Sequence, residues 1–163
     1  ADKLAAVGTA AEAFRPQLLG ATVRDPKLGE TSQSLRFGTQ FNNAAAAADG
    51  YTIVGYGTVL MSKAKWEASG GGALVIGRAQ SVSREGTNLG TANSVVEYGV
   101  SIINIAAANL DDDVLARSYV TYRKDGVTYT VYSTNLSEGD SMACARSVTG
   151  VLTAISNRQR GAL

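Results

Sequence analysis

The most informative part of this chain is VLARSYVTYRKDGVTYTVY, residues 114–132. Two runs rich in β-branched and aromatic residues flank Asp125-Gly126, and such a pair favours a type I′ turn because both positions need positive φ, which Gly accepts freely. The stretch therefore predicts a β-hairpin. Counting outward from the turn sets every cross-strand pair, ending with Tyr119 opposite Tyr132.

This register also sorts the hairpin into two faces, because side chains alternate across a strand. The face expected in the core holds Val120, Tyr122, Tyr129 and Val131, and the face expected at the surface holds Tyr119, Thr121, Arg123, Thr128, Thr130 and Tyr132. Two adjacent tyrosines with Arg117 and Arg123 close by would suit stacking on a sugar ring or a protein interface. The competing interpretation is that Tyr and Thr are simply good strand formers.

The rest of the chain predicts more strands of the same kind. Extended segments are expected at 21–24, 34–41, 51–63, 73–82 and 94–103, with a helical turn or two in the alanine run 44–48 and a flexible loop at the glycines 70–72. Helices are not regularly placed between the extended segments. The order therefore favours an antiparallel β-sandwich or barrel over parallel βαβ units.

The end of the chain has a different pattern. Ser137 followed by Asp140 is a plausible helix start, and apolar residues then recur at helical spacing up to Asn157: Met142, Ala145, Val148, Leu152 and Ile155. We therefore expect a mainly β domain with one C-terminal amphipathic helix packed on the sheet.

Length and pattern suggest one module. A chain of 163 residues can bury a core without disulfides or metal, and no internal repeat is present. We expect the module over residues 20–158 and a tail over 159–163. Residues 1–19 read as an N-terminal helix or a linker, since Leu4, Val7, Ala11 and Phe14 have helical spacing and Pro16 stops the pattern. The chain begins without Met, as an excised module would.

Composition limits the partners. Hydrophobic residues make up 45% of the chain and charged residues 18%, as in an ordinary folded protein. The net charge is +1 and no run of Lys and Arg occurs, so no nucleic-acid partner is expected. Membrane insertion is not expected either, because no long uncharged apolar run is present. One cysteine makes no internal disulfide.

Reaction chemistry is hard to find in this sequence. The chain has no histidine, which removes Ser-His-Asp and Cys-His arrangements and the usual zinc sites. Cys144 falls on the predicted helix stripe and reads as a small buried hydrophobe. The acidic run Asp111–Asp113 could serve a glycosidase or calcium, but a solvated turn before the next strand is the preferred interpretation. No catalytic residue, metal or cofactor is expected.

Trp66 is the single tryptophan of the chain. It lies among Lys63, Lys65 and Glu67, just before the glycine triplet. Exposed on an edge of the sandwich, it would suit carbohydrate stacking or a partner hot spot. The alternative is that it caps the end of the core while its lysine neighbours stay in solvent.

Several segments carry a family resemblance. The segments are 34–37, 50–59, 101–105, 116–120, 126–133 and 146–148, which read SLRF, GYTIVGYGTV, SIINI, ARSYV, GVTYTVYS and RSV. Together they resemble an uncharacterised β-rich module of large multi-domain surface and secreted proteins of anaerobic Gram-positive bacteria, over residues 20 to 157. Such modules often accompany carbohydrate-active, cell-attachment or dockerin domains. The resemblance implies a secreted or cell-surface accessory role and carries over no catalytic residue.

Two functions are therefore expected to compete. The first is a non-catalytic module that binds a polysaccharide or another surface glycan through Trp66 or through Tyr119, Tyr132, Arg117 and Arg123. The second is a structural spacer or protein-interaction module of a larger adhesin or scaffold, which predicts buried aromatic residues. A small hydrolase ranks below both, because it would need two carboxylates converging in a cleft.

Overall fold

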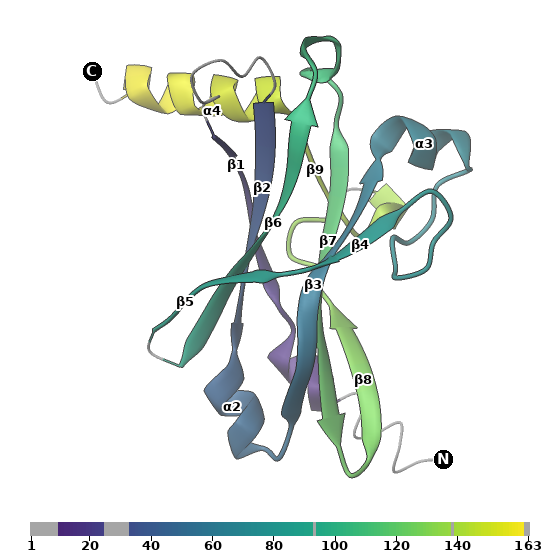
Figure 1. The fold of residues 1–163 in the computed structure, drawn as a ribbon, viewed down its shortest axis with the longest axis vertical. Helices are drawn as coiled ribbons and strands as arrows, with labels where there is room; N and C mark the ends of the chain where they lie inside the picture. Colours follow the sequence, from purple (N-terminus) through teal and green to yellow (C-terminus); the bar gives the residue numbers. More distant parts are fainter. Residues whose placement is uncertain (1–9, 25–32, 93, 138, 162–163) are drawn as a thin grey trace.

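Two antiparallel sheets pack face to face in the computed structural model, which describes residues 10–24, 33–92, 94–137 and 139–161 (Figure 1). The first sheet has the order β1 (Gln17–Arg24), β2 (Gln33–Asn42), β6 (Val95–Ile105) and β5 (Thr87–Ala92). The second has the order β4 (Val82–Glu85), β3 (Thr52–Ser62), β7 (Val114–Lys124) and β8 (Val127–Tyr132), and β9 (Cys144–Arg146) also pairs with β7. The prediction of a mainly β sandwich is confirmed.

Helical segments close the two ends of the sandwich. The 3-10 turn η1 (Glu12–Phe14) and helix α2 (Asn43–Ala48) lie at one end, and α4 (Val148–Gly161) lies at the other, against β1 and β2 (Figure 1). Helix α3 (Lys63–Ala68) follows β3, and two further 3-10 turns are η2 (Ala107–Asn109) and η3 (Gly139–Ser141). Leu4 and Val7 of the expected N-terminal helix lie outside the described residues. No helix in the described ranges is long and apolar enough to cross a membrane.

The C-terminal helix is present, but its predicted start was wrong. Helix α4 begins at Val148, while Cys144 and Ala145 belong to β9 and Met142 precedes them with a positive φ of 58°. Strand β8 ends at Tyr132 and leaves the first residues of β7 without a partner on that side, and β9 pairs with them. Tertiary pairing therefore overrides the helical spacing of the sequence. Cys144 is buried, on a strand rather than on the helix.

The hairpin of β7 and β8 has the predicted register. Pairing runs without a shift from Lys124 and Val127 to Tyr119 and Tyr132. The turn residues Asp125 and Gly126 have φ values of 53° and 76°, as a type I′ turn requires.

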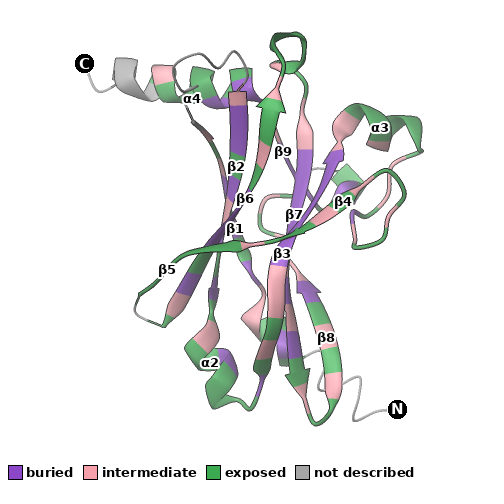
Figure 2. Cartoon of the chain, viewed as in Figure 1, coloured by how far each residue is buried: buried purple, intermediate pink, exposed green. Residues whose placement is uncertain are grey.

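The inner face of the hairpin belongs to the core. Val120, Tyr122 and Val131 are buried beside Phe41 and Tyr98, and Tyr129 packs partly buried against the same cluster. Figure 2 shows that buried residues are frequent along β2 and β7. A second cluster, with Leu35 and Phe37, fills the sandwich nearer α4. These clusters hold the two sheets together.

The outer face of the second sheet is also covered in part, which the sequence did not predict. Residues 69–81, between α3 and β4, cross this face, and their Leu74 is fully buried against Val59, Met61 and Leu115. The expected strand over 73–82 was therefore wrong, since only Val82–Glu85 pairs with β3.

The glycine triplet shapes this covering segment. All three glycines have positive φ, between 80° and 97°, and their backbones hold specific partners. Gly71 N–H donates to the Trp66 carbonyl, and Gly72 N–H donates to Asp140 Oδ2 at 3.0 Å. The expected flexible loop thus has defined contacts.

One strand passes from one sheet to the other. Gly86 separates β4 in the second sheet from β5 in the first, and the two run on as one ribbon across the molecule (Figure 1). The N–H of Gly86 donates to the Tyr56 carbonyl, and a Cβ at Gly86 would lie 2.3 Å from Cδ2 of Tyr98. Only glycine fits this corner without a shift of the ring.

Candidate binding groove along strand β8

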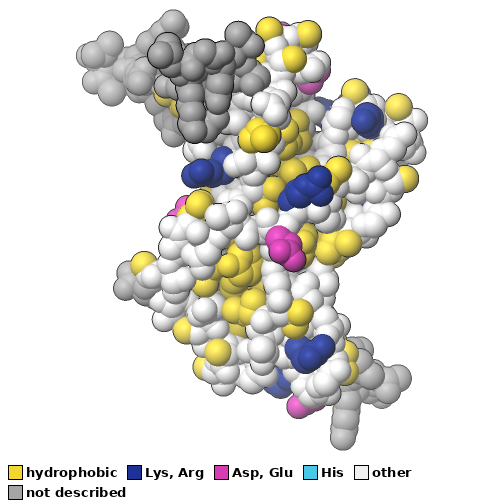
Figure 3. Space-filling model, viewed as in Figure 1, with side chains coloured by type: hydrophobic (Ala, Val, Ile, Leu, Met, Phe, Trp, Pro, Cys, Tyr) yellow, Lys and Arg dark blue, Asp and Glu magenta, His cyan; other side chains and the backbone are white. Residues whose placement is uncertain are grey.

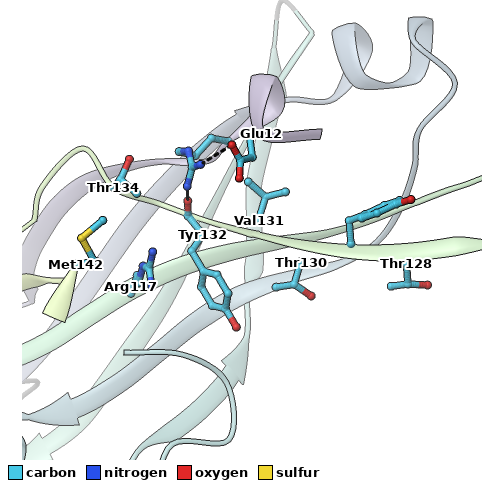
Figure 4. Close-up of a pocket in the computed structure, with 10 residues that line it drawn as sticks. Glu12, Arg117, Thr128, Thr130, Val131, Tyr132, Thr134 and Met142 are labelled. Atoms are coloured by element: carbon cyan, nitrogen blue, oxygen red, sulfur yellow. Dashed lines mark hydrogen bonds and ion pairs between the residues drawn. The ribbon is translucent and has the colours of Figure 1, made fainter. Parts of the chain in front are cut away.

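A groove of about 760 Å³ runs along the outer edge of β8 (Figure 4). Its walls combine aromatic, hydroxyl and charged side chains from η1, β7, β8 and the segment before β9. The lining residues are Glu12, Arg15, Arg117, Thr128, Tyr129, Thr130, Val131, Tyr132, Thr134 and Met142. We call this feature the β8 groove.

The backbone of β8 alternates between its partner strand and the groove. In an antiparallel pair, only every second residue turns its N–H and C=O toward the partner. Ser133 N–H donates to the Ser118 carbonyl at 2.8 Å, which fixes the phase: Tyr129 and Val131 bond to β7. The N–H and C=O groups of Thr128 and Thr130 therefore point into the groove.

One end of the groove is closed by side chains. Arg15 donates from Nη1 to the outward carbonyl of Tyr132, and Arg15 Nη2 lies 3.6 Å from Glu12 Oε2. Met142 lines the same end, exposed and in a left-handed backbone conformation that non-glycine residues seldom adopt. Figure 4 shows Arg117, Thr134 and Met142 around Tyr132, with Thr128 at the far end.

The other outer strands carry features that discourage further pairing. Asn135 covers β1 by accepting from the Leu18 N–H at 2.9 Å and donating to its carbonyl at 2.7 Å. Strand β4 has four residues, of which Arg84 and Glu85 are charged, and β5 has a register shift between Asn88 and Gly90. Bulges, charges, short length and coverage are the usual protections of a sheet edge. Among the outer strands that the structure describes, β8 is uncharged, regular and without such a device from residue 127 to 131.

Arg117 is a structural residue of this region. It is 7% exposed, donates from Nε to the Ser133 carbonyl at 3.0 Å and from Nη1 to the Leu74 carbonyl at 3.2 Å. Its guanidinium lies 4.7 Å from the centre of the Tyr132 ring. Burial lowers the pKa of Arg117 from its ordinary value. The side chain therefore ties the covering segment to β7 and the end of β8.

Tyr119 and Tyr132 do lie side by side, with ring centres 6.4 Å apart. Both are half-buried against the cluster that contains Leu74, and the Tyr132 hydroxyl accepts from the Ile76 N–H at 3.1 Å. Burial raises the pKa of Tyr119. The face that the sequence placed at the surface is thus shared between the covering segment and the groove.

Trp66 packs against the same cluster and does not line the groove. Its indole N–H donates to the Gly72 carbonyl at 2.7 Å, and its ring lies 3.4 Å from the position that a Cβ of Gly71 would occupy. Arg123 is exposed on β7, opposite Thr128 and four positions along the strand from Tyr119, roughly 13 Å away. The structure therefore brings Arg117, Tyr119, Tyr132 and Trp66 to one cluster and leaves Arg123 apart.

Several groove residues were missed by sequence reasoning. Arg15 and Met142 come from segments distant in sequence, and no local pattern places them beside β8. Tyr129 was predicted to lie in the core. Its register is as predicted, but an edge strand also exposes part of its inner face to solvent, and Tyr129 therefore lines the groove as well. The alternation of the hairpin could have identified Thr128 and Thr130, had the edge position of β8 been known.

Other surfaces carry less chemistry. A second hollow, of about 380 Å³, lies between the sheets near β4, with Leu60, Val82, Ile102 and Arg84 in its lining. On the face drawn in Figure 3, Lys and Arg side chains are scattered and hydrophobic ones gather along the middle. Across the described ranges, no group of three or more His, Cys, Asp or Glu residues could hold a metal ion. Within the acidic run, Asp113 forms an ion pair with Lys63, with Oδ2 of Asp113 3.9 Å from Nζ of Lys63.

Comparison with known proteins adds no relative. No protein-family model, no curated protein sequence and no solved structure matches the chain.

Proposed function

We propose that this chain is a non-catalytic accessory module of a larger secreted or cell-surface protein, and that it binds an extended segment of a partner protein by strand addition along β8. One observation carries the binding mode: the outward N–H and C=O groups of Thr128 and Thr130 line a groove on an edge without protection. The extracellular setting is supported by the resemblance of the sequence alone.

A strand added at β8 would lie about 4.8 Å from it and form four backbone hydrogen bonds with Thr128 and Thr130. Alternate side chains of the partner would point toward Glu12 and Arg15 on one side and toward Tyr132 on the other. Backbone bonds would supply affinity, and these side chains would supply selectivity.

Selection from a displayed peptide library tests this function. The intact chain serves as bait, and a Thr130→Pro variant serves as the comparison, because Pro removes an outward N–H while the bonds to β7 remain. Thr130→Val is the matched control, since it keeps the N–H. We expect peptides that bind the intact chain and Thr130→Val but not Thr130→Pro. Peptides that bind all three equally would contradict strand addition.

Glycan binding is the second candidate, and the lining of the same groove favours it. Tyr129 and Tyr132 offer aromatic surface, and the hydroxyl groups of Thr128, Thr130 and Thr134 can bond to a sugar. Affinity electrophoresis in plant, mucin and cell-wall polysaccharides checks this function. Retardation lost in Tyr129→Ala and kept in Trp66→Phe would place a glycan in the groove, whereas retardation lost only in Trp66→Phe would place it near α3.

A further inference from the structure

We infer that β8 pairs with β8 of a second copy of this chain. The two strands would be antiparallel and related by a twofold axis at Tyr129. The inference rests on the proposed strand addition and names its occupant. It is drawn from the register, the charges and the composition of the β8 edge.

The register follows from which backbone groups are available. Arg15 already occupies the outward carbonyl of Tyr132, so an added strand has the groups of Thr128 and Thr130. An antiparallel pair centred on Tyr129 places Thr128 of each copy opposite Thr130 of the other. Each opposed pair exchanges two hydrogen bonds, which gives four in total and leaves the Arg15 contact in place.

The same register brings opposite charges together twice. It carries the Asp125-Gly126 turn of one copy past Tyr132 of the other, where Arg15 lies. Asp125 is exposed at one end of β8, and Arg15 is partly exposed at the other. Glu12 also lies beside Arg15, so the second carboxylate would share the guanidinium with it. Twofold symmetry repeats the contact, as in any isologous interface.

The edge itself presents nothing that would repel a copy. The six residues of β8 are Val, Thr and Tyr, without charge, Pro or Gly. Thr128 opposite Thr130 is a favourable cross-strand pair. Across the four strands of the pair, Arg123 on β7 is opposite Thr128 on β8. The next residues in the same row, both from the other copy, are Thr130 on β8 and Thr121 on β7, so the two arginines do not face each other.

Disulfide trapping tests the register directly. The two Tyr129 residues would form a pair without hydrogen bonds, with Cα atoms about 4.5 Å apart, within the range of a disulfide. Thr128 of the two copies would lie about 8 Å apart, beyond disulfide reach. Under mild oxidation we expect Tyr129→Cys to form covalent dimers at least about tenfold faster than Thr128→Cys. The native Cys144 is buried and common to both variants.

Sedimentation equilibrium at high protein concentration supplies the second measurement. We expect Thr130→Pro to weaken association at least about tenfold and Thr130→Val to preserve it. Asp125→Asn should weaken it several-fold, more at low salt, because Asn-Gly keeps the type I′ turn and loses only the charge.

Two outcomes would overturn the inference: equal trapping of Tyr129→Cys and Thr128→Cys, or a chain that stays monomeric at millimolar concentration. Neither outcome touches the proposed function, which fails only if library peptides ignore Thr130→Pro. A chain that remains monomeric but binds peptides at β8 would keep strand addition and reject the second copy as the occupant.

Discussion

Arg117 and Arg123 lie on the same face of β7, yet only Arg117 is buried. The sequence correctly grouped Arg117 with Tyr119 and Tyr132, because strand register decides which side chains share a face. It could not predict their burial. The segment that covers them, 69–81, comes from another part of the chain, and its irregular backbone has no periodic pattern.

The two arginines form a matched pair of substitutions. Arg117→Met leaves two backbone carbonyls without their buried donor, so we expect the free energy of unfolding to fall by about 3 kcal/mol. Arg123→Met, at the exposed position, should change it by less than about 0.5 kcal/mol. Urea unfolding of both variants measures the difference, and equal effects would show that Arg117 is not a structural tie.

Gly55 and Gly57, two positions apart on β3, form a second pair. A Cβ at Gly57 would lie 2.2 Å from the Arg84 carbonyl oxygen and 2.6 Å from the Tyr119 hydroxyl, while a Cβ at Gly55 meets nothing within 4 Å. We expect Gly57→Ala to destabilise the fold by about 2–3 kcal/mol and Gly55→Ala to be close to neutral. Thermal and urea unfolding would reveal the contrast, and a neutral Gly57→Ala would refute the close approach of β4.

At the scale of elements, prediction succeeded where a local signal decides the structure. The Asp-Gly turn specifies the β7–β8 hairpin, and the alanine run, capped by Asn42, forms α2. It failed at β9 and at the start of α4, because β9 pairs with residues of β7 that β8 leaves unpaired. This unpaired edge exists only in the folded sheet. The candidate site has the same character, since the sequence gives the strand but not its place at an edge.

Amide hydrogen exchange along β8 should show a period of two. Tyr129 and Val131 donate to β7 and should exchange slowly, whereas Thr128 and Thr130 point into the groove and should exchange fast in dilute solution. NMR-detected exchange measures this. The two threonine amides should become protected on strand addition, and uniform protection in a dilute monomer would contradict the edge assignment.

Asn135 allows a complementary test at β1. Its carboxamide bonds both to the N–H and to the carbonyl of Leu18, where an added strand would bond. Asn135→Ala should speed exchange of the Leu18 amide at least about tenfold while β2 keeps its protection. An unchanged Leu18 rate would mean that this carboxamide does not guard the edge.

At the scale of the whole molecule, two buried phenols link stability to alkaline pH. Tyr98 donates to the carbonyls of Gly57 and Tyr119, and Tyr122 donates to the Phe14 carbonyl. Burial raises the pKa of both phenols above the ordinary value of about 10. Above about pH 10 the unfolded chain loses phenol protons that the folded chain retains, so the free energy of unfolding falls as pH rises.

The expected slope is up to about 1.4 kcal/mol per pH unit for each phenol above pH 10. Urea unfolding between pH 8 and 11.5 measures it, and absorbance at 295 nm reports the phenolates. Tyr122→Phe should lower this slope by up to about 1.4 kcal/mol per pH unit, at some cost in stability at pH 8. A stability independent of pH up to 11.5 would show that both phenols ionise equally in the folded and unfolded states.

The crossing at Gly86 also has a mechanical consequence. Strands β4 and β5 are one continuous piece of backbone, hydrogen-bonded into the second sheet on one side of Gly86 and into the first sheet on the other. A load that slid one sheet over the other would have to break the β3–β4 ladder or the β5–β6 ladder, or drag Gly86 past the Tyr98 ring. The continuous backbone of β4 and β5 therefore links the two sheets at the middle of the sandwich. Shear along the strands is resisted by this covalent link as well as by side-chain packing.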